Sequence, residues 1–333
     1  MSPSTMTRLA TAAVAAVAAL AMGGCGLGSA LVGVHDAPSE HTSTPPVGAE
    51  SAQAIATRVL ADAARARAAT GAEAKDLRAK ALTGAALTVS TADSRLAKAG
   101  SAATEPVTKP TEPKVLAISR GTAWPRVMLV QGTREDGATV LNLLTSAEAS
   151  APFKLAASAP MQAGSKVAAL DAINEGSPLN PRGTGLAIAP KDLLAEYAAS
   201  LAYPTPKPAA HINSGDRFTH AVLTNARTQA ASLGKLATLT QKHTPQPEDT
   251  VVISLKDGGA VVFGLIERID AITLKPTGKS LTPNPDFQKL LGKQTLTKQA
   301  EMRTFETVVF TVPPKGRANL VAVDETLVSA KGK

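Results

Sequence analysis

Two segments of the chain show the same order of patterns: helices first, then strands joined by tight turns. In the first segment, apolar residues at helical spacing begin at Ser51, and Asp136-Gly137 separates two later runs rich in Val and Leu. In the second, helical spacing begins at Pro190, and Asp257-Gly258-Gly259 separates two runs of the same kind. Asp-Gly pairs favour the turns that join antiparallel strands. This order predicts an α+β fold with helices on one face of each antiparallel sheet.

The expected elements follow from these patterns. In the first segment, one helix spans Ser51–Thr70 and a shorter one ends before Gly84, whereas residues 85–98 are ambiguous. Its expected strands are Val115–Ser119, Arg126–Gln131, Thr139–Leu144 and Phe153–Ala159. In the second segment, one helix begins at Pro190 and another ends before Gly234. The strands expected after them are Lys235–Lys242, Thr250–Lys256, Ala260–Ile269, Ala271–Lys275, Arg303–Val312 and Ala318–Val328.

Glycine and proline gather between the two segments and set the expected domain boundaries. Residues 50–175 form the first predicted domain, residues 176–187 a linker, and residues 188–330 the second domain. Residues 25–49 are polar and rich in Gly and Pro, so they cannot bury enough apolar surface to fold. We expect them to be a flexible tether.

The first residues have the features of an export signal. Arg8 precedes an apolar run from Leu9 to Met22, and Gly23-Gly24-Cys25 follows it. A membrane-spanning helix needs about 20 apolar residues, and the run is shorter. A signal peptide cleaved elsewhere would leave Cys25, the single cysteine of the chain, as a free thiol in an oxidising compartment. Both difficulties disappear if the cysteine itself is modified.

The sequence Leu20-Ala21-Met22-Gly23-Gly24-Cys25 resembles a bacterial lipoprotein signal. Met22 departs from that pattern, in which leucine is more common at this position. The resemblance implies that residues 1–24 are cleaved off between Gly24 and Cys25, and that Cys25 receives fatty chains such as palmitate. Two or more chains hold a protein stably on a bilayer. We therefore expect a protein on the extracytoplasmic face of the cell membrane, with the membrane as its partner through the lipid anchor at Cys25.

The order of elements is similar to the nuclear-transport-factor-2-like superfamily, whose cystatin-like domains are cone-shaped. The resemblance is carried by the helices Ser51–Thr70 and Pro190–Leu201 and by the hairpins Val127–Leu144 and Val251–Leu274. It implies two tandem cone-like domains, each an N-terminal helix pair packed on a curved antiparallel sheet around a conical pocket. Tandem copies behind a lipid anchor resemble actinobacterial lipoproteins of unknown function. Fold alone gives no function, because this superfamily includes both enzymes and binding modules.

Composition excludes one class of partner. The chain of 333 residues has a formal net charge of +8, but its Lys and Arg residues are scattered singly and only 3% of residues are aromatic. A nucleic-acid-binding surface gathers basic residues into a patch with aromatic side chains among them. We therefore expect no nucleic-acid partner. A basic surface of this kind is typical of a solvated protein.

The best candidate for acid–base chemistry is Asp216 with His220, which lie one helical turn apart. The structural interpretation is stronger, because Ser214-Gly215-Asp216 is a typical helix N-cap sequence. We expect Trp124 to fill a core or close the mouth of a cone, although it could also stack on a ligand. Tyr197 shares the apolar face of its helix and is expected in the core. The remaining candidates lack the spacing of a catalytic or phosphate-binding motif: Tyr203, His211, His243, Ser158, Ser165 and Gly183-Thr184-Gly185.

These observations favour a non-catalytic module that binds an envelope protein or a small apolar ligand. No catalytic residue, metal ligand or cofactor is expected, because one Cys and five His are too scattered to form a metal site. Two alternatives stay open. One is an isomerase-like or hydrolase-like enzyme that uses a cone pocket with Asp216 and His220, and the other is a structural accessory of an envelope complex.

Overall fold

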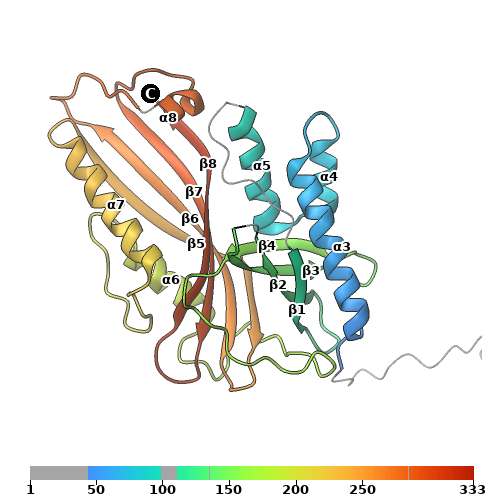
Figure 1. Cartoon of the computed structure of the whole chain (residues 1–333). Coiled ribbons are helices and arrows are strands. Elements are labelled where there is room, and N and C mark those ends of the chain that lie inside the picture. The colour runs from blue at the N-terminus through green and yellow to red at the C-terminus, as the bar shows by residue number, and fades with distance from the viewer. Residues whose placement is uncertain (1–43, 99–110, 135, 284) are drawn as a thin grey trace, which may run out of the picture. The chain divides into compact units, whose positions relative to one another are not determined.

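Two four-stranded antiparallel sheets, each a simple meander, organise the chain (Figure 1). The computed structural model describes residues 44–98, 111–134, 136–283 and 285–333. The expected α+β class is confirmed, with helices before each sheet. Gly24, Cys25 and most of the expected tether lie outside the described residues. No helix in the described part is long and apolar enough to cross a membrane.

The first sheet follows three helices. These are α3 (Ala49–Ala68), α4 (Ala74–Ala81) and α5 (Gly84–Lys98). The strands are β1 (Thr111–Ile118), β2 (Arg126–Thr133), β3 (Thr139–Ser146) and β4 (Lys154–Pro160). The predicted turn at Asp136-Gly137 joins β2 to β3, whose ends pair at Thr133 and Thr139. Gly137 has a φ of +81°, a conformation that favours glycine.

The second sheet follows two helices and has longer strands. The helices are α6 (Pro190–Ser200) and α7 (Arg217–Leu233). The strands are β5 (Ala237–Ser254), β6 (Ala260–Leu274), β7 (Gln299–Val312) and β8 (Asn319–Gly332). A short helix, α8 (Pro285–Leu291), lies between β6 and β7 in the sequence. Figure 1 shows α6 and α7 along one face of this sheet.

Several expected boundaries were wrong. The short helix α8 was not expected, and two pairs of expected strands are single strands, β5 and β6. Residues 85–98, which the sequence left ambiguous, belong to the helix α5. Pro245 and Pro247 suggested a break inside β5, but β5 is an edge strand, where a missing backbone N–H is tolerated. The pairing with β6 is instead interrupted by a bulge between Gln246 and Val251. This bulge matters for the site described below.

Both faces of each sheet carry buried residues. One core cluster joins α3 to the outer face of the first sheet through residues such as Val59 and Met128. A second joins α6 to the outer face of the second sheet, where the ring of Tyr197 meets Phe310 edge-on at 5.0 Å between centroids. The third lies between the sheets and includes Leu129 and Phe263. Residues on opposite faces alternate along each strand, so the two sheets pack on one another and carry helices outside.

The apolar layer between the sheets links the two predicted domains. Backbone bridges reinforce the link, because Met161 pairs with Ala322 and Leu179 pairs with Ile253. The arrangement is compatible with two tandem domains, each built from helices and a meander. It adds a contact that the sequence did not predict, since each sheet was expected to bury one face only.

Candidate functional site

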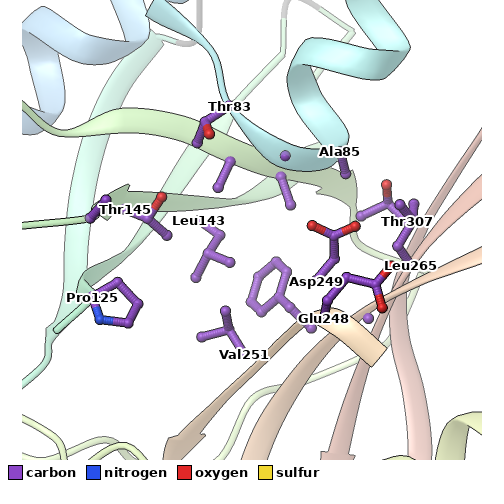
Figure 2. Close-up of a pocket in the computed structure, with 16 residues that line it drawn as sticks. Thr83, Ala85, Pro125, Leu143, Thr145, Glu248, Asp249, Val251, Leu265 and Thr307 are labelled. Carbon is purple, nitrogen blue, oxygen red and sulfur yellow. The ribbon is translucent and has the colours of Figure 1, made fainter. Parts of the chain in front are cut away.

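A cavity of about 190 Å³ lies where the two sheets meet the start of α5 (Figure 2). Its walls come from the N-terminus of α5, from β3 and β4, and from β5 to β7. The lining is Thr83, Gly84, Ala85, Pro125, Leu143, Thr145, Ala147, Ala156, Ala157, Glu248, Asp249, Val251, Phe263, Gly264, Leu265 and Thr307. Most of these side chains are apolar or small. The shape and chemistry are those of a site for a small molecule.

Two carboxylates give this cavity its polarity. Glu248 and Asp249 lie in the bulge of β5 and are the ionisable residues of the lining. Figure 2 shows them together at one side of the cavity, with Leu143, Thr145 and Pro125 lying away from them. The Oδ1 atom of Asp249 lies 3.5 Å from the position that a β-carbon on Gly84 would take. Asp249 therefore lies against the N-terminus of α5.

The surroundings of Glu248 and Asp249 disfavour a negative charge on both carboxylates at once. Burial, with the neighbouring charge of Glu248 adding to it, raises the pKa of Asp249 above its usual value. The N-terminus of a helix carries roughly half a positive charge, which offsets part of the negative charge. No hydrogen bond or ion pair to another described residue is made by the carboxylate of Glu248 or Asp249.

A buried ionic network lies on the opposite, helix-covered face of the second sheet. Arg268 is at its centre, with Nη1 3.0 Å from Oε1 of Glu306 and Nε 3.2 Å from Oδ2 of Asp270. Its Nη1 also lies 2.8 Å from Oε2 of Glu325. Burial alone would lower the pKa of Arg268, but the three carboxylates outweigh it and raise that pKa. The guanidinium is thus held in its charged form.

A histidine and an amide extend the network along β5. Nδ1 of His243 lies 3.0 Å from Oε2 of Glu306, and the Nε2 amide of Gln241 donates to Oδ1 of Asp270 at 2.7 Å. His243 and Glu306 have fully buried side chains. Within the described part of the chain, Nε2 of His243 and Oε1 of Gln241 have no hydrogen-bond partner. Neither His243 nor Glu306 lines the cavity of Figure 2, which Thr307 reaches from the other face of β7.

A third charged group lies where the helices of the first half meet β8. Arg67 of α3 and Asp93 of α5 both interact electrostatically with Asp324 of β8. Burial raises the pKa of Asp324 to about 6, because it outweighs the opposing effect of Arg67. Burial also lowers the pKa of Arg67, and the two acids limit that change. This group joins the two halves electrostatically.

A second cavity, of about 180 Å³, lies on the helix-covered face of the second sheet. It is bounded by α7, α8 and the sheet. Its lining contains no ionisable residue and consists of Gln229, Leu233, Ile272, Leu281, Thr282, Pro283, Phe287, Leu291, Leu296, Ala300 and Met302. It lacks the charged groups that would orient a ligand. The cavity of Figure 2 is therefore the better candidate site.

In the described part of the chain, no hydrogen bond joins the side chains of the predicted pair Asp216 and His220. Asp216 caps α7, where it accepts hydrogen bonds from the backbone N–H of Thr219 at 2.8 Å and from its hydroxyl at 2.6 Å. The structural interpretation of Asp216 is thus confirmed, and His220 is exposed. Tyr197 is in the core as predicted, and its hydroxyl lies 3.1 Å from the Thr219 hydroxyl. Burial and then the charge of Asp216 raise the pKa of Tyr197.

The expectation that Trp124 fills a core was wrong. Its side chain is 42% exposed, with the guanidinium carbon of Arg126 4.9 Å from the ring centre. The next residue, Pro125, lines the cavity of Figure 2, so Trp124 is adjacent to this lining in the sequence. An indole stacked on a cation tolerates such exposure.

The other residues considered in the sequence have structural surroundings. His211 is paired with Glu196 at 2.8 Å, and the Ser158 hydroxyl donates to Oδ1 of Asn142 at 2.9 Å. Tyr203 pairs through its backbone with Gln241 at the edge of β5. Ser165 lines an open groove beside the first sheet, and Asn180 bonds Thr184 in the glycine-containing loop. In the described part of the chain, no group of three or more His, Cys, Asp or Glu could hold a metal ion.

The sequence did not identify the residues of the cavity of Figure 2 or of the ionic network around Arg268. His243 was judged to have no ligand spacing, and Glu248 and Asp249 lie in a polar, proline-containing segment that resembles a loop. His243 and Glu306 are 63 residues apart in sequence, and only the register of β5, β6 and β7 brings them together. The one available signal was the polar interruption of apolar strands, at Arg268, Asp270 and Glu306.

Comparison with known proteins places the chain in a family. Residues 44–332 match Domain of unknown function (DUF8094). The match covers nearly the whole described part, including both sheets, and the chain therefore belongs to the DUF8094 family. No curated protein matches it. No solved structure matches it either.

Proposed function

We propose that this DUF8094 protein is an exported lipoprotein whose folded part binds a small, largely apolar molecule. Acyl chains on Cys25 would hold it on the extracytoplasmic face of the membrane, and residues 25–49 would tether the folded part. The two helix-and-meander halves would be cone-like domains. The proposal for location depends on the sequence around Cys25 alone.

The cavity of Figure 2 is the observation that carries the binding function. Apolar cavities of about 150 Å³ in proteins accept a benzene molecule, so 190 Å³ leaves room for a ring and a few further atoms. Its walls belong to well-packed strands and to one helix end, which makes the site largely preformed. Glu248 and Asp249 are the ionisable residues of its lining, and the other lining residues are apolar, small or hydroxyl-bearing.

Benzyl alcohol, a neutral probe of suitable size, tests this function. Trp124 is the single tryptophan of the chain and stands next to Pro125 of the lining, so its fluorescence reports on occupancy. For a ligand of this size we expect an affinity of about 1 mM. Thr145→Phe should abolish the signal by filling the cavity from its partly exposed rim. Binding that persists unchanged in Thr145→Phe would show that the probe occupies another place.

One observation favours a second candidate, an enzyme. The pair of His243 and Glu306 has the geometry of a base held by a carboxylate, with the far nitrogen free of partners in the described part. For this function, a substrate would have to reach a side chain that is fully buried. Hydrolysis of a panel of model esters, lost in His243→Gln with folding retained, would support it. Equal activity of the two proteins would exclude it.

A further inference from the structure

The cavity of Figure 2 combines an apolar body with a local negative charge. Of its lining residues, Glu248 and Asp249 can ionise, and both are acidic. The chain as a whole has a net charge of +8, so this local sign does not follow from composition. A ligand chosen by such a site would have an apolar part and a positive group.

The two carboxylates have no positive partner in the part of the chain that the structure describes. Asp249 is partly buried and Glu248 is exposed, whereas the buried acidic groups Glu306 and Asp270 are both paired with Arg268. The N-terminus of α5 supplies roughly half a positive charge to Asp249, which leaves more than one negative charge uncompensated. A partly buried charge without a partner is costly to the folded protein.

The positions of the carboxylates suit a shared cation. They are adjacent in sequence, and the bulge of β5 places both on the lining of one cavity. The apolar side chains Leu143 and Val251 lie on the same lining and can contact the uncharged part of a ligand (Figure 2).

We propose that this cavity binds small organic amines in their ammonium form. The ammonium group lies between Glu248 and Asp249, and the hydrocarbon part lies against Leu143, Val251 and Phe263. This inference rests on the proposed function, because it assumes that the cavity takes a small ligand. It adds the chemical class of that ligand and the residues that select it.

Three probes of nearly equal shape and different charge test the inference on the full chain. These are benzylammonium, benzyl alcohol and benzoate, each followed by Trp124 fluorescence and by calorimetry. Two partly exposed ion pairs should make benzylammonium bind roughly tenfold more tightly than benzyl alcohol. Benzoate should bind most weakly. Added salt should weaken the binding of benzylammonium and leave that of benzyl alcohol unchanged.

Two double variants locate the charge effect. Glu248→Gln with Asp249→Asn should bring benzylammonium to the affinity of benzyl alcohol, whose own affinity should stay the same. Glu73→Gln with Glu175→Gln changes the net charge equally at exposed positions away from the cavity, and should preserve the tenfold preference. Circular dichroism and melting curves would establish that all variants fold.

The outcomes separate the two proposals. If benzyl alcohol binds and benzylammonium binds no better, the binding function stands and the selection of amines is wrong. If no probe binds, the binding function fails as well. A preference for benzylammonium that survives in the Glu248 and Asp249 double variant would also overturn the inference, because the charge effect would then come from elsewhere.

Discussion

Nδ1 of His243 lies 3.0 Å from Oε2 of Glu306, and both side chains are completely buried. Arg268 joins them through the second oxygen of Glu306 and is itself almost buried. Because each carboxylate of this network depends on the one guanidinium, the structure predicts a large effect when that group is removed.

Arg268→Met should destabilise the protein by about 3 to 5 kcal/mol, because Glu306 and Asp270 would be left buried without a positive charge. Urea unfolding of the variant gives this value. Arg303→Met is the matched control, since Arg303 is 43% exposed and pairs with Glu267 at 2.9 Å. It should cost less than about 1 kcal/mol. Equal losses in the two variants would contradict the role given to burial.

Asp216→Ala should lower the free energy of unfolding by about 1 kcal/mol, because α7 would lose the acceptor of its N-cap. Asp216→Asn keeps an oxygen acceptor and should lower the free energy of unfolding by only a few tenths of a kcal/mol. Thermal melting of the two variants measures the difference. If Asn is as damaging as Ala, the charge of Asp216 matters more than its hydrogen bonds to Thr219.

The contribution of Asp324 to the stability of the protein should fall as the pH rises from about 4 to about 6. The pKa of Asp324 is about 6 in the folded protein, against an ordinary value of 3.8. In this range the folded state holds a proton that the unfolded state has lost, so raising the pH favours unfolding. The contribution is at most about 1.4 kcal/mol per pH unit.

Asp324→Asn isolates this contribution from those of other titrating groups. Unfolding free energies measured across the range should decline with pH in the natural protein more steeply than in the variant. Parallel curves would mean that Asp324 titrates as it does in the unfolded chain, and that Arg67 compensates it fully.

Cys25→Ala should release the protein from the membrane once residues 1–24 have been removed, because an alanine cannot carry acyl chains. Fractionation of cells that export the natural form with its own signal, and Cys25→Ala behind an ordinary cleavable leader, checks this. Mass spectrometry of the natural form should find the mass of fatty chains on Cys25. A cleaved Cys25→Ala protein that stays with the membrane would refute the lipid anchor.

Local signals were sufficient to predict most of the elements. Asp136-Gly137 and Asp257-Gly258-Gly259 mark real hairpins, and Asp216 marks a real helix start. Residues 84–98 were harder, because β-branched residues such as Thr88 and Val89 weaken the helical pattern. Pro245 and Pro247 concealed the continuity of β5, since their tolerance depends on its edge position, which only the tertiary structure fixes.

The sequence also contains a less direct signal that the two sheets pack on one another. A strand with one solvated face alternates apolar and polar residues, but Val127–Val130 are all apolar and all buried. Such continuous runs are typical of strands covered on both sides. The sites depend on register and on contacts across more than a hundred residues, as between Gly84 and Asp249, and no local pattern encodes those.

The shared layer between the sheets has a consequence for how the chain reaches its final state. Leu129, Leu141 and Leu143 are made early, yet their partners Val309 and Val321 are among the last residues to be synthesised. The apolar face of the first sheet therefore stays exposed to solvent until nearly the whole chain has been synthesised. A cell that makes this protein needs either rapid completion or a chaperone to cover that surface in the meantime.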